Sequence, residues 1–102
     1  MGPREGDVVA RRTDDNQREI VAALRAIGAT VQDLSAVGKG CPDLLVGMQG
    51  RNLLLEVKKP PGPRGGQAGK LTEDQVSWHG SWRGQVAIVS GVSSAVQAVL
   101  GR

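Results

Sequence analysis

The apolar positions near the start of the chain recur at helical spacing. Ile20, Leu24 and Ile27 lie three to four residues apart, which is typical of one face of an amphipathic helix. Polar residues at 13–16 are N-cap candidates ahead of this stripe, and Gly28 is suited to the residue that follows a helix end. The pattern therefore predicts a first helix between these two signals.

Short apolar runs dominate the middle of the chain and are typical of β-strands. The predicted strands cover 30–34, 43–48, 53–58 and 85–89. Gln-Gly-Arg-Asn at 49–52 predicts a hairpin turn between the second and third of them. Thr72 and Gln75 fit a capping box that opens a second helix, which Gly84 ends, and the apolar spacing over 92–100 predicts a last helix.

The order of these elements predicts an α/β fold, with a mixed central sheet of about four strands flanked by helices. Residues 13–102 form one predicted domain, because the chain of 102 residues has room for one modest core. Residues 1–12 combine charge, Gly and Pro without periodicity, so we expect a flexible N-terminal arm there.

The composition of the chain limits which residues can form the core and which can bind a metal ion. Aromatic residues make up 2% of the chain, so the core must be aliphatic. The single Cys41 and the single His79 exclude a cysteine-cluster or multi-histidine metal site, so a catalytic metal would need oxygen ligands, as Mg²⁺ or Mn²⁺ does. No apolar run approaches the roughly 20 residues of a membrane helix, and no secretory core is present near the N-terminus, so we expect an intracellular protein without a membrane partner.

The predicted hairpin carries three charged residues at one end. Side chains alternate along a strand, so Glu56 and Lys58 share a face. A turn centred on Gly50-Arg51 places Asp43 opposite Lys58 and Leu45 opposite Glu56, with the two acids as diagonal neighbours roughly 7–8 Å apart. Two carboxylates at that spacing can share a divalent cation, which favours hydrolysis of phosphodiesters. The alternative is a solvent-facing strand end where Lys58 pairs with Asp43.

Two helical residues are candidates to join this cluster. Glu19 is followed at helical spacing by a strip of alanines (Ala22, Ala23 and Ala26), which would let the helix approach the sheet closely. Gln75 shares a helical face with Trp78, His79 and Trp82. We expect the two tryptophan rings to cover the sheet or a dimer contact, and His79 to serve packing or the surface.

Gly40-Cys41-Pro42-Asp43 followed by Leu55-Glu56-Val57-Lys58 resembles the PD-(D/E)XK nuclease motif. The wider pattern over 13–100 is similar to small phage-type VRR-NUC domains, which implies a restriction-endonuclease-like core. The resemblance makes Glu19, Asp43 and Glu56 the metal-binding acids, with the carbonyl oxygen of Val57 as a further ligand. It makes Asp43, Glu56, Lys58 and Gln75 the catalytic set.

The resemblance implies a Mg²⁺- or Mn²⁺-dependent, structure-selective endonuclease acting on branched DNA such as four-way (Holliday) junctions, in the cytoplasm of a bacterial or phage-infected cell. A homodimer is expected, because one site cuts one strand and about 100 residues offer little surface to hold a duplex. The alternatives are a non-catalytic DNA-binding or assembly subunit and a nuclease acting on plain duplex or flap DNA.

The net charge of +3 and the cation-rich segment after the third predicted strand favour contacts with DNA phosphates. The candidates for these contacts are Lys39, Lys59, Arg64 and Lys70, to which Arg11 and Arg12 could add.

Overall fold

The computed structural model describes residues 13–61 and 69–101, so the predicted arm at 1–12 lies outside the described residues. These two ranges contain three helices and four strands. In chain order they are α2 (Thr13–Ala26), β1 (Thr30–Asp33), β2 (Leu44–Met48), β3 (Arg51–Val57), α3 (Glu73–Ser81), β4 (Val86–Val89) and α4 (Val92–Leu100). None of the helices in these two ranges is long and apolar enough to cross a membrane.

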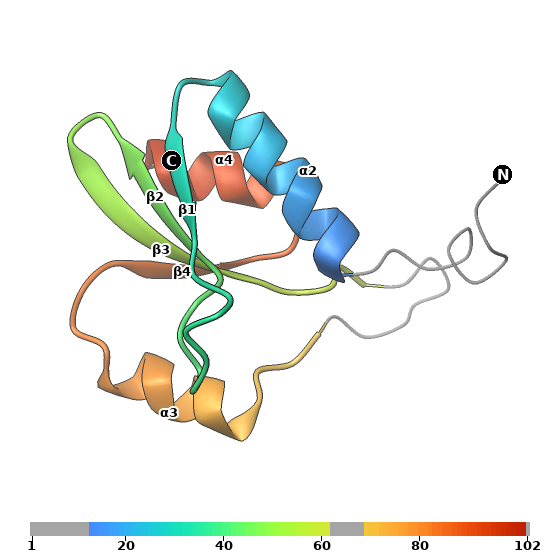
Figure 1. Ribbon diagram of the computed structural model, residues 1–102, viewed down its shortest axis with the longest axis vertical. Helices are drawn as coiled ribbons and strands as arrows, with labels where there is room; N and C mark the ends of the chain where they lie inside the picture. The colour runs from blue at the N-terminus through green and yellow to red at the C-terminus, as the bar shows by residue number, and fades with distance from the viewer. Residues whose placement is uncertain (1–12, 62–68, 102) are drawn as a thin grey trace, which may run out of the picture.

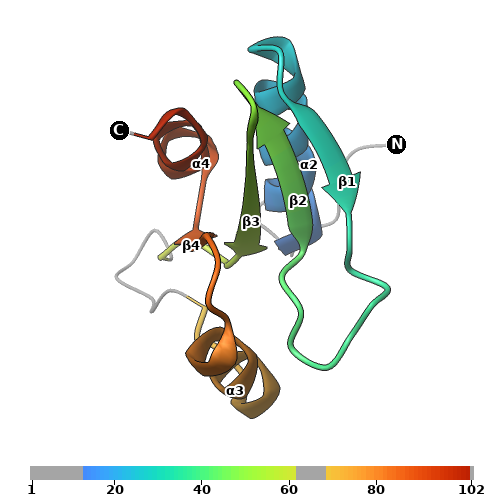
Figure 2. The ribbon, with the colours of Figure 1, turned by 90° about the vertical axis from the view of Figure 1, so that its left-hand side faces the viewer.

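The four strands form one mixed sheet in the order β1-β2-β3-β4. β1, β2 and β3 are antiparallel neighbours, while β4 pairs in parallel with β3. The predicted α/β fold with a mixed four-stranded sheet is thereby confirmed. Figure 1 shows α2 and α4 lying together against the sheet, and both views place α3 beyond one end of the strands (Figures 1 and 2).

The hydrophobic core lies between one face of the sheet and the two helices α2 and α4. Alternate residues of the central strands point into it, because side chains of a strand alternate between faces. The buried aliphatic residues are Leu44 and Val46 of β2, Leu55 and Val57 of β3, Val89 of β4, Ile20 and Leu24 of α2, and Ala95 and Val99 of α4. An aliphatic core is what the low aromatic content predicts.

Neither tryptophan covers the sheet, so that part of the prediction is wrong. Trp78 and Trp82 stack on one another along α3, with ring centroids 4.6 Å apart. α3 has no buried residue and Trp82 is 44% exposed. The rings lie outside the core because α3 packs at the end of the strands instead of across the sheet.

The β2–β3 hairpin is shifted by two residues from the predicted register. Met48 pairs with Arg51 and Leu44 with Leu55, so the turn consists of Gln49 and Gly50. Both turn residues have positive φ, at 53° and 77°. A two-residue hairpin turn with positive φ at both positions matches the twist of the flanking strands, which explains why the turn forms one residue earlier than expected. A shift of two residues keeps every side chain on its predicted face.

Candidate active site

Asp43 lies at the start of β2 and is held there by two hydrogen bonds. Its backbone carbonyl accepts one from the amide of Leu34 at 2.7 Å, which extends the β1–β2 ladder by one step. Its carboxylate oxygen Oδ2 accepts another from the amide of Val57 at 2.8 Å. The preceding Pro42 is fully buried and fixes the entry to the strand. The carboxylate of Asp43 is therefore anchored to the end of β3.

Glu56 is the neighbour of Asp43 across the two strands. Continuing the observed register one step beyond Leu44 and Leu55 places Asp43 opposite Glu56, so the predicted pairing of Asp43 with Lys58 is wrong. The Glu56 side chain is 2% exposed. Its burial, followed by hydrogen bonding and charge repulsion from Asp43, raises the pKa of Glu56 to about 8, while Lys58 acts in the opposite direction. The two acids thus form a close pair that resists carrying two charges.

Gln75 connects Lys58 to Glu56. The ammonium group of Lys58 donates a 2.6 Å hydrogen bond to Oε1 of Gln75 and lies 3.9 Å from Oε2 of Glu56. The amide nitrogen Nε2 of Gln75 donates to the same Oε2 at 3.3 Å. The structure therefore brings Asp43, Glu56, Lys58 and Gln75 into one cluster at the ends of the strands.

The first turn of α3 fixes the position of Gln75. Thr72 accepts a hydrogen bond from the amide of Gln75 at 3.2 Å, and Gln75 Oε1 accepts one from the amide of Thr72 at 2.9 Å. This is the predicted capping box, and it ties the Gln75 side chain to its own helix start. The same oxygen that completes the box accepts the hydrogen bond from Lys58.

Gly40 brings the loop before β2 against α3. A Cβ atom at this residue would lie 2.2 Å from the carbonyl oxygen of Asp74 and 2.9 Å from the amide nitrogen of Gln75. Its φ of +84° is also a conformation that favours glycine. Only glycine fits this contact, which joins the loop carrying Pro42 and Asp43 to the helix carrying Gln75.

His79, for which the sequence favoured packing or a surface position, packs with its ring toward Glu56. Its Nε2 lies 3.8 Å from Oε1 of Glu56, and neither of these buried atoms has a hydrogen-bond partner within the described residues. Burial and the nearby Lys58 lower the pKa of His79, which keeps the ring neutral at pH 7. Its spacing of four residues from Gln75 was the available signal, since both side chains then share a helical face.

Asn16 is a site residue that the sequence placed near the start of the first helix without assigning it a role in the site. It is 3% exposed and lies within α2, whose first residue is Thr13. Its side-chain amide donates to the carbonyl oxygen of Lys58 at 3.1 Å and to that of Ser90 at 2.9 Å. Asn16 therefore holds the backbone of Lys58 against α2.

Among the described residues, Glu19 belongs to no group of three acids. Its side chain is exposed, as are those of Ala22 and Ala26, so the alanine strip does not pack closely against the sheet as expected. α2 turns Ile20 and Leu24 toward the core instead. Across 13–61 and 69–101, no three His, Cys, Asp or Glu residues are grouped so that they could hold a metal ion.

The donors that are present still fit a hard divalent cation. Asp43 and Glu56 supply adjacent carboxylates, and Oε1 of Glu56 is buried without a hydrogen-bond partner among the described residues. A cation would offset the repulsion that raises the pKa of Glu56. Mg²⁺ is usually bound by one or two carboxylates together with water and substrate phosphates, and β3 places the backbone carbonyl of Val57 next in the chain.

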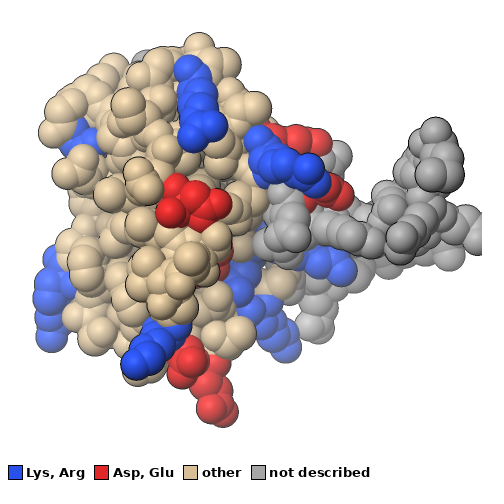
Figure 3. Space-filling view, in the orientation of Figure 1, with Lys and Arg blue, Asp and Glu red and all other residues tan. Residues whose placement is uncertain are grey.

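The predicted phosphate contacts are only partly described. Lys39, Lys59 and Lys70 have exposed side chains, whereas Arg64, like Arg11 and Arg12, lies outside the described residues. On the face shown in Figure 3, Lys and Arg side chains lie apart from one another with acidic side chains between them. Charge on this face is therefore dispersed.

Comparison of the chain with protein-family models, with curated proteins and with solved structures finds no match in any of the three. Only the geometry of this cluster therefore indicates a function for the chain.

Proposed function

We propose that the protein is a Mg²⁺- or Mn²⁺-dependent, structure-selective DNA endonuclease of the PD-(D/E)XK type, with branched DNA such as four-way junctions as its substrate. One observation carries the proposal: two adjacent acids, a lysine and a glutamine meet in one hydrogen-bonded cluster at the end of the sheet. Acids and an ammonium group in such an arrangement serve phosphodiester hydrolysis.

Asp43 and Glu56 are the proposed metal-binding residues, with the Val57 carbonyl as a further donor. A bound divalent cation supplies activation of water at neutral pH and neutralises charge on the phosphate. The described residues offer two acids and not three, so we expect the DNA phosphate and water to complete the coordination. Affinity for the cation should therefore be higher in the presence of DNA than in its absence.

Lys58 is the proposed catalytic lysine. Its ammonium group is held by Gln75 at 2.6 Å, and the Asn16 side chain fixes its backbone carbonyl. Held this way, the ammonium group can stabilise the negative charge that develops on the phosphate oxygens in the transition state. Gln75 is the residue that positions it, because the capping box leaves the glutamine little freedom.

The experiment is cleavage of labelled four-way junction, flap and duplex DNA in the presence of Mg²⁺ or Mn²⁺. We expect cutting of the branched substrates, loss of cutting in Asp43→Ala, and normal cutting in a control at an exposed acid of α3, Glu73→Gln. Absence of cleavage with every substrate, or full activity in Asp43→Ala, would refute the proposal.

A second candidate is a non-catalytic DNA-binding subunit that keeps the nuclease fold. The exposed position of Glu19, away from any three-acid group in the part of the chain described, favours it. This candidate predicts salt-sensitive DNA binding that does not depend on metal and is unchanged in Glu56→Ala.

We also propose a homodimer, because two sites related by a two-fold axis would act on two strands of a junction. Sedimentation equilibrium tests this directly, and a monomer at the concentrations that support junction cleavage would contradict it.

A further inference from the structure

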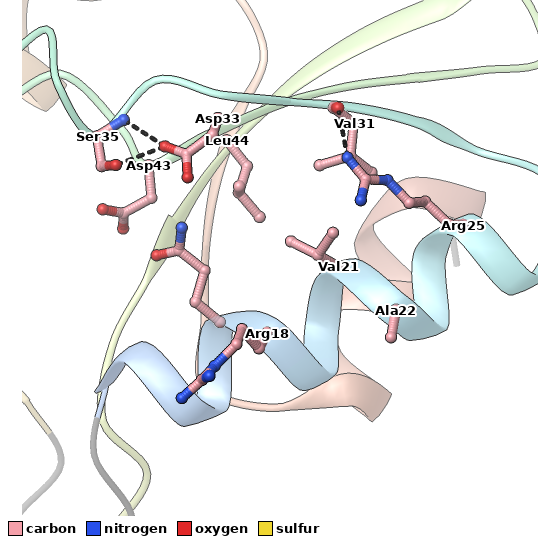
Figure 4. Close-up of a pocket in the computed structure, with 10 residues that line it drawn as sticks. Arg18, Val21, Ala22, Arg25, Val31, Asp33, Ser35, Asp43 and Leu44 are labelled. Carbon is pink, nitrogen blue, oxygen red and sulfur yellow. Dashed lines mark hydrogen bonds between the residues drawn. The ribbon is translucent and has the colours of Figure 1, made fainter.

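A groove runs between α2 and the β1–β2 side of the sheet and ends at Asp43 (Figure 4). Its volume is about 670 Å³, within the ~300–1,000 Å³ typical of small-molecule sites. Asp43 lines one end of it, so the groove and the candidate active site share a residue. A ligand lying in the groove would therefore reach the carboxylate of Asp43.

The middle of the groove is apolar. Val21 and Ala22 come from α2, and Val31 and Leu44 come from the strands opposite. Figure 4 shows Val21 and Leu44 between the two ends of the groove. The sugar–phosphate backbone of DNA is polar and gains nothing from burial against apolar side chains. The flat faces of a nucleobase, in contrast, are stabilised by burial against aliphatic side chains.

Two arginines of the same helix line the groove. Arg18 and Arg25 are exposed, and each carries hydrogen bonds that leave part of its guanidinium available: Arg18 pairs with Asp15, and Arg25 donates to the carbonyl oxygen of Val31 at 3.3 Å. A guanidinium has five N–H donors, so these contacts do not exhaust either group. Both can therefore bind phosphate.

The end near Asp43 offers groups suited to the edge of a base. Asp33 accepts hydrogen bonds from the amide of Ser35 at 2.8 Å and from its hydroxyl group, and these bonds lower the pKa of Asp33. The ionised carboxylate is an acceptor for an exocyclic amine such as that of cytosine. It also repels phosphate, so phosphates should lie toward the arginines.

We infer that this groove receives one unpaired nucleotide of the DNA strand that is cut, with its base between α2 and the strands and its phosphate toward Arg18 and Arg25. The inference rests on the proposed function and adds the substrate feature that the enzyme selects. A base inside a duplex is stacked and paired and cannot enter a lateral groove. Flap and fork branches expose unpaired nucleotides, and a base at the exchange point of a four-way junction unstacks more easily than one inside a duplex, so the groove would select branched over fully paired DNA.

The first test fills the groove. Ala22→Trp places a large ring at an exposed lining residue, and Ala26→Trp places the same ring one turn along α2, where it does not line the groove. Binding of a fluorescent oligodeoxycytidylate of about eight nucleotides, measured without metal, should weaken roughly tenfold in Ala22→Trp and stay unchanged in Ala26→Trp. Equal binding by the two variants, or no binding by the unmodified protein, would overturn the inference.

The second test needs no substitution. Titration of isotope-labelled protein with deoxycytidine 5′-monophosphate should shift the NMR signals of Val21, Ala22 and Val31. Inorganic phosphate should shift them much less, because it has no base to bury. Equal shifts with phosphate, or shifts confined to α3, would overturn the inference.

These readouts separate the two proposals. If the unmodified protein binds the oligonucleotide through the groove but cleaves no DNA, the inference that the groove binds a nucleotide is supported and the proposed nuclease function is refuted. If it cleaves junctions while Ala22→Trp cleaves and binds as well as Ala26→Trp, the nuclease function stands and the groove inference fails. Arg25→Gln adds a third measure: the slope of log affinity against log salt should fall by about 0.7 for the lost phosphate contact.

Discussion

The carboxylate of Asp43 accepts a 2.8 Å hydrogen bond from the backbone amide of Val57. A candidate catalytic side chain therefore also closes the ladder between β2 and β3 where their regular pairing ends. The structural and the chemical role of Asp43 can be separated, because a neutral amide oxygen can accept the same hydrogen bond but lacks the charge with which a carboxylate binds a divalent cation.

Replacing Asp43 by alanine should cost about 1–3 kcal/mol of unfolding free energy, because the Val57 amide loses its acceptor in a half-buried position. Asp43→Asn should cost less than about 1 kcal/mol, since it keeps an oxygen at that place. Urea unfolding of both variants measures the difference, and cleavage should be lost in both. Equal destabilisation by the two substitutions would show that the hydrogen bond does not anchor the strand end.

Glu56 should make the protein less stable as pH rises. Its pKa is about 8 in the folded protein against an ordinary value of 4.5, so between these values the folded state keeps a proton that the unfolded state has released. The unfolding free energy must then fall with pH, by at most about 1.4 kcal/mol per pH unit. The contribution is fully present below pH 4.5 and is lost as pH rises through 8.

Glu56→Gln removes this titration, so its unfolding free energy should change little between pH 7 and 8 and should exceed that of the unmodified protein at pH 8. The lowered pKa of His79 makes the unfolding free energy rise with pH instead of fall, but only below the ordinary value of 6.5, so it does not affect the range between pH 7 and 8. Glu73→Gln, at an exposed acid of α3, is the control and should keep the slope. A slope unchanged in Glu56→Gln would mean that Glu56 is ionised in the folded protein.

The fold and the polar cluster could be predicted because both depend on short-range patterns. Alternation in β2 and β3 places Glu56 and Lys58 on one face, and this holds even though the predicted register was wrong by two residues. The capping box likewise fixes Gln75 locally, through residues three apart. Chemistry that depends on strand faces and helix starts is visible in the sequence.

Long-range docking could not be predicted in the same way. Asn16 and Glu19 lie on the same helix three residues apart, and helical spacing alone does not tell which of them faces the end of β3. The structure turns Asn16 inward to two backbone carbonyls and leaves Glu19 exposed. The positions of the two tryptophans of α3 could not be predicted for the same reason. That helix is placed by a contact between Gly40 and Asp74, which are far apart in the sequence.

Gly40→Ala should therefore damage the site as well as the fold. The added methyl group would meet the Asp74 carbonyl at 2.2 Å and must push α3 away, at a cost of about 2–4 kcal/mol including the left-handed backbone. Gly38→Ala is the matched control: its φ is +76°, but nothing lies within 4 Å of the new Cβ, so only the backbone cost of about 1–2 kcal/mol remains. Cleavage should fall in Gly40→Ala alone, because Gln75 moves with α3. Equal losses of stability and activity in the two variants would contradict the close contact.

Divalent cations should stabilise the protein through the acid pair and not through Lys58. A ligand at tenfold its dissociation constant adds about 1.4 kcal/mol to the unfolding free energy, which raises the melting temperature of a domain this small by roughly 5–10 °C. The rise on adding Mn²⁺ should persist in Lys58→Ala and vanish in Asp43→Asn, while cleavage falls at least about 100-fold in both.

Arg83→Ala, which removes an exposed cation just beyond α3, is the control for charge. It should keep both the stabilisation by Mn²⁺ and the cleavage activity. Loss of the Mn²⁺ effect in Lys58→Ala would place the lysine in cation binding instead of in stabilisation of the transition state. We expect the lysine to act on the reaction, because its ammonium group is held by the amide oxygen of Gln75 at 2.6 Å and lies 3.9 Å from Glu56.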